Sequence, residues 1–175
     1  MYNVSLEHLK EKALHALFGS RKHANFSKLK PSLACKIFAA IISPISSYNS
    51  EIWGVYVKHD FKSWDNTPIE KNHVKFCKRY LEISHKVSNV SSRSELGRFP
   101  LIINIYKNIL DYILYLVCKN EDTIVKQAFR TSLELHYNGK NSFYHNVIKI
   151  SEYYDLPDFD PNNLSEAKIK HYIDK

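Results

Sequence analysis

The chain has 175 residues, is 44% hydrophobic and carries a formal net charge of +7. This length and composition exclude wholesale disorder and fit one domain with a real core, with or without an appended helical tail. Four glycines and six prolines are few for a β-sandwich, which needs many tight turns.

The N-terminal half predicts helices joined by polar loops. Leucines at helical spacing predict a first helix over residues 5–18, capped by Ser5 and stopped by Gly19. A second helix is expected over residues 32–42, because Pro31 suits its first turn and Pro44 should break or kink it. The other expected elements are a basic loop over 21–30, a loop over 59–68, a third helix over 68–83 and a polar, mobile stretch over 84–94.

The C-terminal half also predicts only helices. An apolar run over residues 101–118 follows Pro100 and is polar along one stripe, which is typical of a helix in the middle of a bundle. Asn138-Gly139 predicts a turn between helices over 123–135 and 142–154. A linker over 156–161 and a short helix over 165–173 complete the chain. We therefore expect an all-α fold, an irregular bundle of about six to seven helices with no significant β-sheet.

The sequence predicts an intracellular protein, cytoplasmic or nuclear. Charged residues interrupt any early apolar run, so no signal peptide is expected. Residues 101–117 include four polar or charged side chains, whereas a membrane-spanning helix needs roughly 20 mostly apolar residues. The three cysteines Cys35, Cys77 and Cys118 are odd in number and far apart, which favours buried thiols in a reducing compartment over a disulfide framework.

Charge is distributed unevenly along the chain. Residues 1–98 hold 16 Lys/Arg against 8 Asp/Glu, a net charge of +8, whereas residues 99–175 hold 9 against 10, a net charge of −1. A basic half of this kind suits a polyanionic partner, although many proteins with such a half never bind nucleic acid.

The helix expected over residues 68–83 has two faces. Its apolar side collects the residues at i, i+4, i+7, i+8 and i+11, namely Ile69, His73, Phe76, Cys77 and Tyr80. Its basic side carries Lys71, Lys75 and Lys78, with Arg79 adjacent. Three cations in two turns can follow a phosphate backbone and release its counterions. A solvated basic face explains the same stripe equally well.

Residues 43–54 combine a proline, a tyrosine, a glutamate, a tryptophan and a glycine at fixed spacing: Pro44, Tyr48, Glu51, Trp53 and Gly54. The string resembles a signature in the C-terminal region of reverse transcriptases from non-LTR (LINE-like, jockey-like) retrotransposons. In that family a run such as Pro-Ile-Leu-Leu-Tyr-Gly-Ser-Glu-Val-Trp-Gly follows the polymerase palm. Here Ser46-Ser47 replaces two apolar residues and Asn49 replaces a glycine, so we expect different packing around Tyr48.

Three further blocks resemble the same family, in the same order. Residues 12–18 resemble a Lys-Ala-Leu-x-Ala-Leu-Phe helix. Residues 69–81 resemble a block of the form Ile-Glu-x-x-His-x-Lys-Phe-Leu-Lys-x-x-Leu through Glu70, His73 and Phe76, with Cys77 in place of a leucine. Residues 94–101 resemble a Glu-Leu-Gly-Arg-x-Pro-Leu string through Glu95, Leu96, Gly97 and Pro100.

The resemblance implies a thumb-like helical region over residues 1–120 and a helical tail of unknown role over 121–175. It implies a fragment of an RNA-directed DNA polymerase without its catalytic palm, which retains at most non-specific binding to the backbone of an RNA/DNA primer–template. The residues expected to contact phosphates are Arg21, Lys22, Lys28, Lys30, Lys71, Lys75, Lys78 and Arg79. The missing palm or a second copy of the chain are further possible partners. No membrane, cofactor or small-molecule substrate is expected.

The chain by itself is not expected to be an enzyme. Polymerisation by two metal ions needs clustered aspartates that hold the ions about 4 Å apart, and reverse transcriptases carry them in an aromatic-x-Asp-Asp turn. The close pair here, Asp158 and Asp160, has different spacing and lies in a proline-flanked linker. His73 and Cys77 do not complete a four-ligand zinc set, so no metal site and no catalytic residue are predicted.

Two interpretations of the aromatic residues stay open. The side chains of Tyr48, Trp53, Tyr56, Phe61 and Trp64 can stack on nucleic-acid bases, but core packing is favoured for Trp53.

The alternative function is a helical protein–protein interaction or self-association module with no nucleic-acid role, in which the helix over 101–117 packs against another chain.

Overall fold

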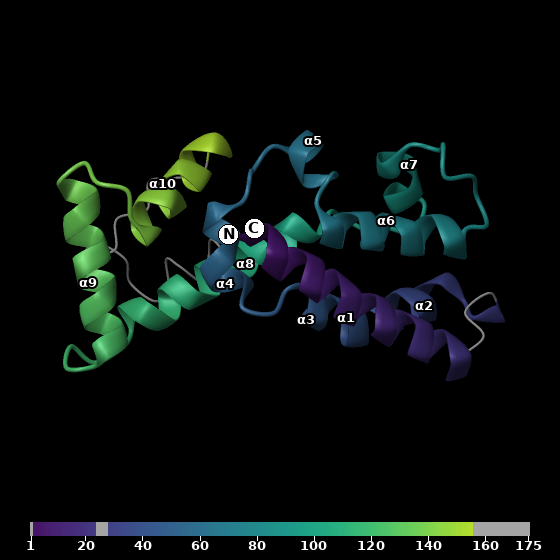
Figure 1. Ribbon diagram of the computed structural model, residues 1–175, viewed down its shortest axis with the longest axis horizontal. Coiled ribbons are helices and arrows are strands. Elements are labelled where there is room, and N and C mark those ends of the chain that lie inside the picture. Colours follow the sequence, from purple (N-terminus) through teal and green to yellow (C-terminus); the bar gives the residue numbers. More distant parts are fainter. Residues whose placement is uncertain (1, 24–27, 156–175) are drawn as a thin grey trace. The chain divides into compact units, whose positions relative to one another are not determined.

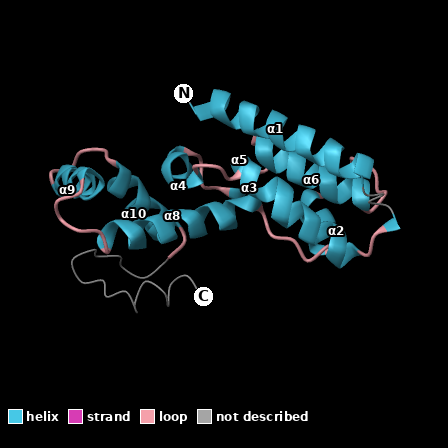
Figure 2. Ribbon diagram, turned by 90° about the horizontal axis from the view of Figure 1, so that it is seen from below, coloured by secondary structure: helices cyan, strands magenta, loops and turns pink. Residues whose placement is uncertain are grey.

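The computed structural model describes residues 2–23 and 28–155, and within these ranges the chain is helical, with no strand (Figures 1 and 2). The expectation of an all-α, irregular bundle is therefore confirmed for the described part of the chain. The linker expected over 156–161 and the helix expected over 165–173 lie outside the described residues.

Helix α1 spans Tyr2–His23 and is longer than predicted at both ends. Ser5 lies inside the helix instead of capping it, and Gly19 does not stop it. Gly19 is exposed and a side chain at its position would meet nothing within 4 Å. An interior glycine costs a helix only about 1 kcal/mol relative to alanine. The buried leucines on the other face outweigh that cost, so residues 21–23 are helix and not loop.

Pro44 does not break the second helical segment. Helix α2 (Pro31–Ile37) continues into a π-helical turn, η2 (Phe38–Ile42), and then into α3 (Ser43–Ser46), where Pro44 occupies the first turn. A proline lacks an N–H and its ring collides with the carbonyl four residues earlier in a regular α-helix. The wider π turn immediately before Pro44 accommodates the ring, which explains why the chain stays helical.

Two short helices follow in stretches where the sequence predicted no helix. Helix α4 (Ser50–Trp53) begins after Asn49, whose φ of +53° is the left-handed conformation that glycine adopts freely and asparagine tolerates best among other residues. Trp53 leads into the 3-10 turn η3 (Gly54–Tyr56). The loop expected over 59–68 contains α5 (Phe61–Trp64), because Asp60 Oδ1 accepts the Ser63 amide as an N-cap.

Helix α6 (Pro68–Tyr80) is the predicted third helix and ends slightly early, because Glu82 has a φ of +54° that terminates it. The stretch expected to be mobile, residues 84–94, instead contains α7 (Asn89–Ser94). Ser92 and Arg93 of α7 are buried and reach the core of unit 1, whereas residues 84–88 are exposed.

The last three helices match their predictions closely. They are α8 (Leu101–Val117), α9 (Ile124–Tyr137) and α10 (Phe143–Tyr153). Thr123 and Ser142 cap α9 and α10 by accepting main-chain N–H groups, and Gly139 makes the predicted turn with a φ of +69°. No described helix combines the length and the apolar character needed to cross a membrane.

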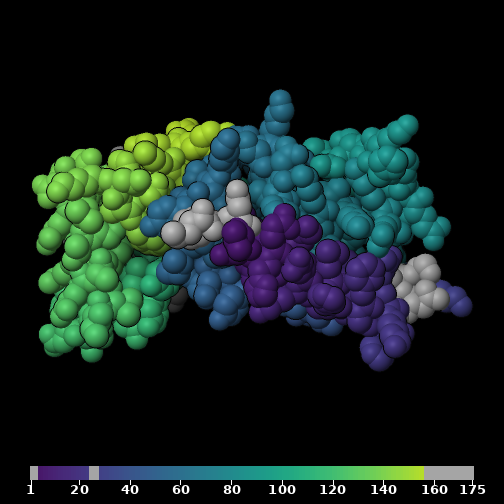
Figure 3. All heavy atoms as spheres, viewed as in Figure 1, coloured from purple at the N-terminus to yellow at the C-terminus, as the bar shows by residue number. Residues whose placement is uncertain are grey.

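The helices form two compact units, which we describe separately. Unit 1 comprises, among the described residues, 2–23, 28–48 and 60–104, and in it α1 packs against α6, α3 and η2. Figure 3 shows the side chains of α1, in purple, at the front of this unit. Its largest fully buried side chains are Phe38, Ile42, Trp64, Ile69, Glu70, His73, Cys77 and Ile102. The expected division into residues 1–120 and 121–175 was drawn from the family resemblance, which the two units do not test, so it stays a prediction.

Unit 2 comprises, among the described residues, 49–59 and 105–155, and in it α10 packs against α9 and η3. Its buried apolar residues include Trp53, Val55, Ile105, Ile109 and Ile113, so the expectation that Trp53 is a core residue is confirmed. Polar contacts join the elements of this unit. Asn108 donates to Ser50 Oγ at 2.8 Å, and His136 and His145 of α9 and α10 share a hydrogen bond between their Nδ1 atoms.

Gly54 allows η3 to lie directly on α8 within unit 2. A Cβ atom at this position would be 2.5 Å from Ile105 Cγ2 and 3.1 Å from Ile109 Cδ1. Both isoleucines are buried, so neither can move aside without opening the core.

We predict opposite effects for two glycine-to-alanine substitutions. Gly54→Ala should lower the free energy of unfolding by about 1–3 kcal/mol through overpacking. Gly19→Ala, in the exposed and open part of α1, should raise it by about 0.5–1 kcal/mol. Urea unfolding of the two variants measures both values. A neutral Gly54→Ala would contradict the close approach of η3 and α8.

Candidate nucleic-acid interface

Helix α6 carries the candidate interface, and its local sequence explains its start. Thr67 is the N-cap, with its Oγ1 accepting the Glu70 N–H, and Pro68 occupies the first turn. The predicted apolar face is confirmed. Ile69, His73, Phe76 and Cys77 are buried, and Tyr80 is half-buried. Lys71, Lys75 and Arg79 are exposed on the other side, and Lys78 is half-buried.

The carboxylate of Glu70 is fully buried beneath this helix and accepts four hydrogen bonds. Its Oε2 accepts from Trp64 Nε1 and from the Leu101 main-chain N–H, both at 2.8 Å. Its Oε1 accepts from Arg93 at 2.9 Å and from His73 Nδ1 at 3.1 Å. One side chain of α6 therefore ties together α5, α7 and the first N–H of α8, all in unit 1.

His73 is neutral in this arrangement. Its Nδ1 lies next to Glu70 and donates to it, while its Nε2 lies 3.3 Å from Arg98 Nε, which can only donate. Burial lowers the pKa of His73; Glu70 opposes this effect, and the nearby charges of Arg98 and Arg93 reinforce it. The imidazole also lies against the Phe38 ring, with centroids 5.2 Å apart. His73 is thus a positioning residue within the core and not a metal ligand paired with Cys77.

Glu70 is ionised. Its burial on its own would raise the pKa of the carboxyl group, but the hydrogen bonds from His73, the Leu101 main chain and Trp64 bring the pKa below its ordinary value. Arg93 is itself buried and is shared with Asp65 at 2.8 Å. The positive charge of Arg93 is therefore compensated inside the unit.

Substitution of Glu70 should destabilise the protein strongly. Glu70→Gln keeps the shape but removes the buried one of the two carboxylate charges that balance Arg93, and it directs an amide donor at groups that donate to Glu70. We expect a loss of about 3–5 kcal/mol in the free energy of unfolding, measured in urea, because breaking a buried ion pair leaves an uncompensated charge. Glu95→Gln, at an exposed position, is the matched control and should change stability by less than about 0.5 kcal/mol.

The pair formed by His73 and Glu70 makes the free energy of unfolding depend on pH. The pKa of His73 is lower in the folded state than its ordinary 6.5, so the unfolded chain binds a proton first as the pH falls. The free energy of unfolding should therefore decrease below about pH 6.5. It should decrease further below about pH 4.5, because the pKa of Glu70 is also lowered by folding. Urea midpoints across this range check the prediction, and His73→Gln should remove the upper step.

The basic residues of α6 line one surface hollow with a volume of about 490 Å³. Four cations border it: Lys71, Lys75, Lys78 and Arg79. Lys78 Nζ is positioned by the His85 carbonyl at 2.8 Å and by Asn89 Oδ1 at 2.9 Å. Within residues 2–23 and 28–155, no ion pair joins any of these four cations to a carboxylate.

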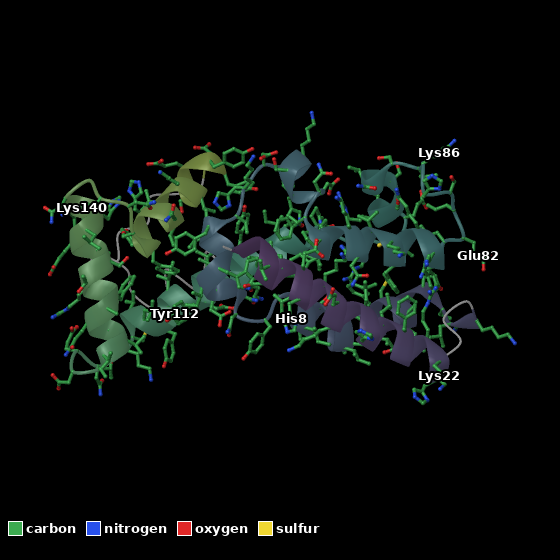
Figure 4. All side chains as sticks on the ribbon, in the orientation of Figure 1. His8, Lys22, Glu82, Lys86, Tyr112 and Lys140 are labelled. Atoms are coloured by element: carbon green, nitrogen blue, oxygen red, sulfur yellow. The ribbon has the colours of Figure 1, made fainter. Side chains whose placement is uncertain are left out.

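The other predicted basic residues gather near the C-terminal end of α6. Arg21 lies in the last turn of α1, near Arg79. Burial lowers the pKa of Arg21, and the charge of Arg79 lowers it further. Lys28 and Lys30 flank Leu29, whose carbonyl accepts the Tyr80 hydroxyl at 2.6 Å. Lys22 is exposed, and its side chain lies at the C-terminal end of α1 (Figure 4).

The structure assigns packing roles to most of the motif residues. Glu70, His73, Phe76, Trp53 and Gly54 are buried. Gly97 has a φ of +60°, which ends α7 and turns the chain toward α8. Leu96 and Pro100 are half-buried in the same connection, and Glu51 lies half-buried near Tyr112. Pro44, Tyr48 and Glu95 are exposed.

Sequence reasoning missed the core roles of Arg93 and Arg98. Arg93 lies in a polar stretch with no periodic pattern, and Arg98 was noted only as the arginine of the Glu-Leu-Gly-Arg string. The signal for cationic partners is Glu70 and His73, three residues apart beside the apolar face of α6. Among the candidate stacking residues, Trp53 and Trp64 are buried, whereas Tyr48, Tyr56 and Phe61 are 65%, 44% and 51% exposed. Of the three cysteines, Cys77 is buried, Cys35 is half-buried and Cys118 is exposed.

Comparisons with family models, with curated proteins and with solved structures returned no match.

Proposed function

We propose that unit 1 binds the phosphate backbone of RNA or DNA through the basic hollow of α6, without reading base sequence. The observation that carries the proposal is the hollow itself, because four cations from one helix border a single concave surface. Phosphate oxygens are the ligands that such cations bind, with release of condensed counterions. The contacts are to charge and not to base edges, so no sequence preference follows.

The buried network under α6 supports this role. Glu70 holds α6 against α5, α7 and α8, and the contact between the tilted rings of Phe38 and Phe76, with centroids 4.4 Å apart, holds α6 against η2. The basic side chains therefore extend from a backbone that is fixed on its inner side. A rigid platform loses less conformational entropy on binding than a loop would.

The sequence resemblance supports a more specific form of the proposal. The four ordered blocks resemble the post-palm, thumb-like region of non-LTR retrotransposon reverse transcriptases, and we propose that the chain is a fragment of such a region. Such a fragment grips a primer–template but does not polymerise on its own, because the aspartate turn that holds the two metal ions is not in its sequence.

Charge reversal in the hollow tests the proposal. Lys71→Glu/Lys75→Glu should weaken binding of a fluorescent RNA–DNA hybrid at least about tenfold and reduce the salt slope of log K by about 2 units, since each phosphate contact contributes about 0.9. Fluorescence anisotropy at several salt concentrations measures both quantities. Lys12→Glu/Lys36→Glu makes the same charge change at exposed positions of α1 and α2 outside the hollow.

The control variant Lys12→Glu/Lys36→Glu should retain most of the affinity for the hybrid and the same salt slope of log K as the wild-type protein. Equal losses in the two double variants would show that only net charge matters and would overturn the assignment to α6. If the wild-type chain binds no hybrid at low salt, and light scattering shows a salt-insensitive oligomer, the nucleic-acid role is wrong and the interaction-module hypothesis replaces it.

A further inference from the structure

A second hollow of about 800 Å³ lies beside the basic one in unit 1. It is walled by α5, α7 and the connection between α7 and α8. Its apolar lining comprises Phe61, Val90, Phe99, Pro100 and Ile103. Four of these side chains are strongly exposed, with Phe99 at 74%, Val90 at 62%, Phe61 at 51% and Ile103 at 44%. Exposed apolar residues gathered in one concavity indicate a binding surface.

The backbone that carries Phe99 is held on both sides. Arg98 bonds to His73 through Nε, approaches the Cys35 carbonyl at 3.4 Å and lies 5.0 Å over the Phe38 ring. After Pro100, the Leu101 N–H donates to buried Glu70. A phenylalanine that is three-quarters exposed on an anchored segment presents a ring whose position is set before any ligand arrives.

The two hollows share one wall residue, Asp65. Its carboxylate accepts from Arg93, which it shares with Glu70, at 2.8 Å and from Asn89 Nδ2 at 3.3 Å, so its negative charge is partly compensated where a polyanion would pass. Arg93, Arg98 and Lys62 are the remaining charged lining residues of the apolar hollow, and all are cations. The surface thus runs from four cations, past the Arg93-paired carboxylate of Asp65, to exposed aromatic rings.

We propose that the apolar hollow receives unpaired bases of a nucleic-acid strand whose phosphates lie in the basic hollow. The inference rests on the proposed backbone binding and narrows its substrate to strands with single-stranded nucleotides. Aromatic rings next to a cationic groove are the combination with which proteins hold single strands, because every base offers a flat face for stacking. Paired bases cannot enter, since they are stacked inside the duplex.

The experiment compares two probes with the same phosphates, an oligothymidylate and an abasic oligonucleotide of equal length. Wild-type protein should bind the first about tenfold more tightly, the effect expected of about one stacked base. Phe99→Ala should abolish that difference while leaving abasic binding unchanged. The matched control Phe18→Ala removes a half-exposed phenylalanine of α1 that lines neither hollow, and it should preserve the difference.

The outcomes separate this inference from the function on which it rests. Equal affinities of the wild-type protein for the two probes would overturn base insertion while leaving backbone binding intact. No binding of either probe at low salt would overturn both. If Phe99→Ala instead dissolves an oligomer and does not change the ratio of the two affinities, the apolar hollow is a protein contact and the inference is wrong.

Discussion

Unit 1 depends on the carboxylate of Glu70. A buried, ionised carboxylate is stable only when its charge and its lone pairs are satisfied, and here four donors converge on it from Trp64, His73, Arg93 and the Leu101 N–H. These donors belong to α5, α6, α7 and α8. The position of each element is therefore constrained by the same two oxygen atoms. The neutral tautomer of His73 follows from this constraint, because its second nitrogen must accept from Arg98.

This arrangement separates charge between the two sides of α6. On the inner side, Arg93 is balanced by Glu70 and Asp65. On the outer side, Lys71, Lys75, Lys78 and Arg79 face a hollow, and no described carboxylate pairs with them. The field at the hollow is consequently positive, which suits a polyanion. The anchored connection after α7 adds exposed aromatic surface next to that field, so electrostatic and stacking interactions are available within one unit.

Much of the fold was predictable from the sequence, and the predictions that were wrong failed for identifiable physical reasons. Helices α6, α8, α9 and α10 follow from apolar periodicity, caps and the Asn138-Gly139 turn, since these signals act within a few residues. Gly19 was misjudged because an interior glycine costs a helix only about 1 kcal/mol, which buried packing offsets. For Pro44, the expected break is wrong because a π turn keeps the chain helical, whereas the alternative, a kink, stays a prediction. Residues 84–94 show no apolar pattern, so no helix was predicted there, but the ion pair of Arg93 with buried Glu70 fixes α7 against α6. The basic stripe was predictable as a stripe, whereas the hollow that it borders was not.

The sequence by itself determined that the described chain is helical and that α6 has one apolar and one basic face, because both properties arise from spacing along the chain. Only the tertiary structure decided which charges are neutralised and which remain available. The partner of Glu70 lies on α7, the segment around Leu29 reaches α6 through the Tyr80 hydroxyl, and Phe99 stands beside the basic hollow. The free energy of a buried charge depends on donors that are distant in sequence, so no local pattern encodes it.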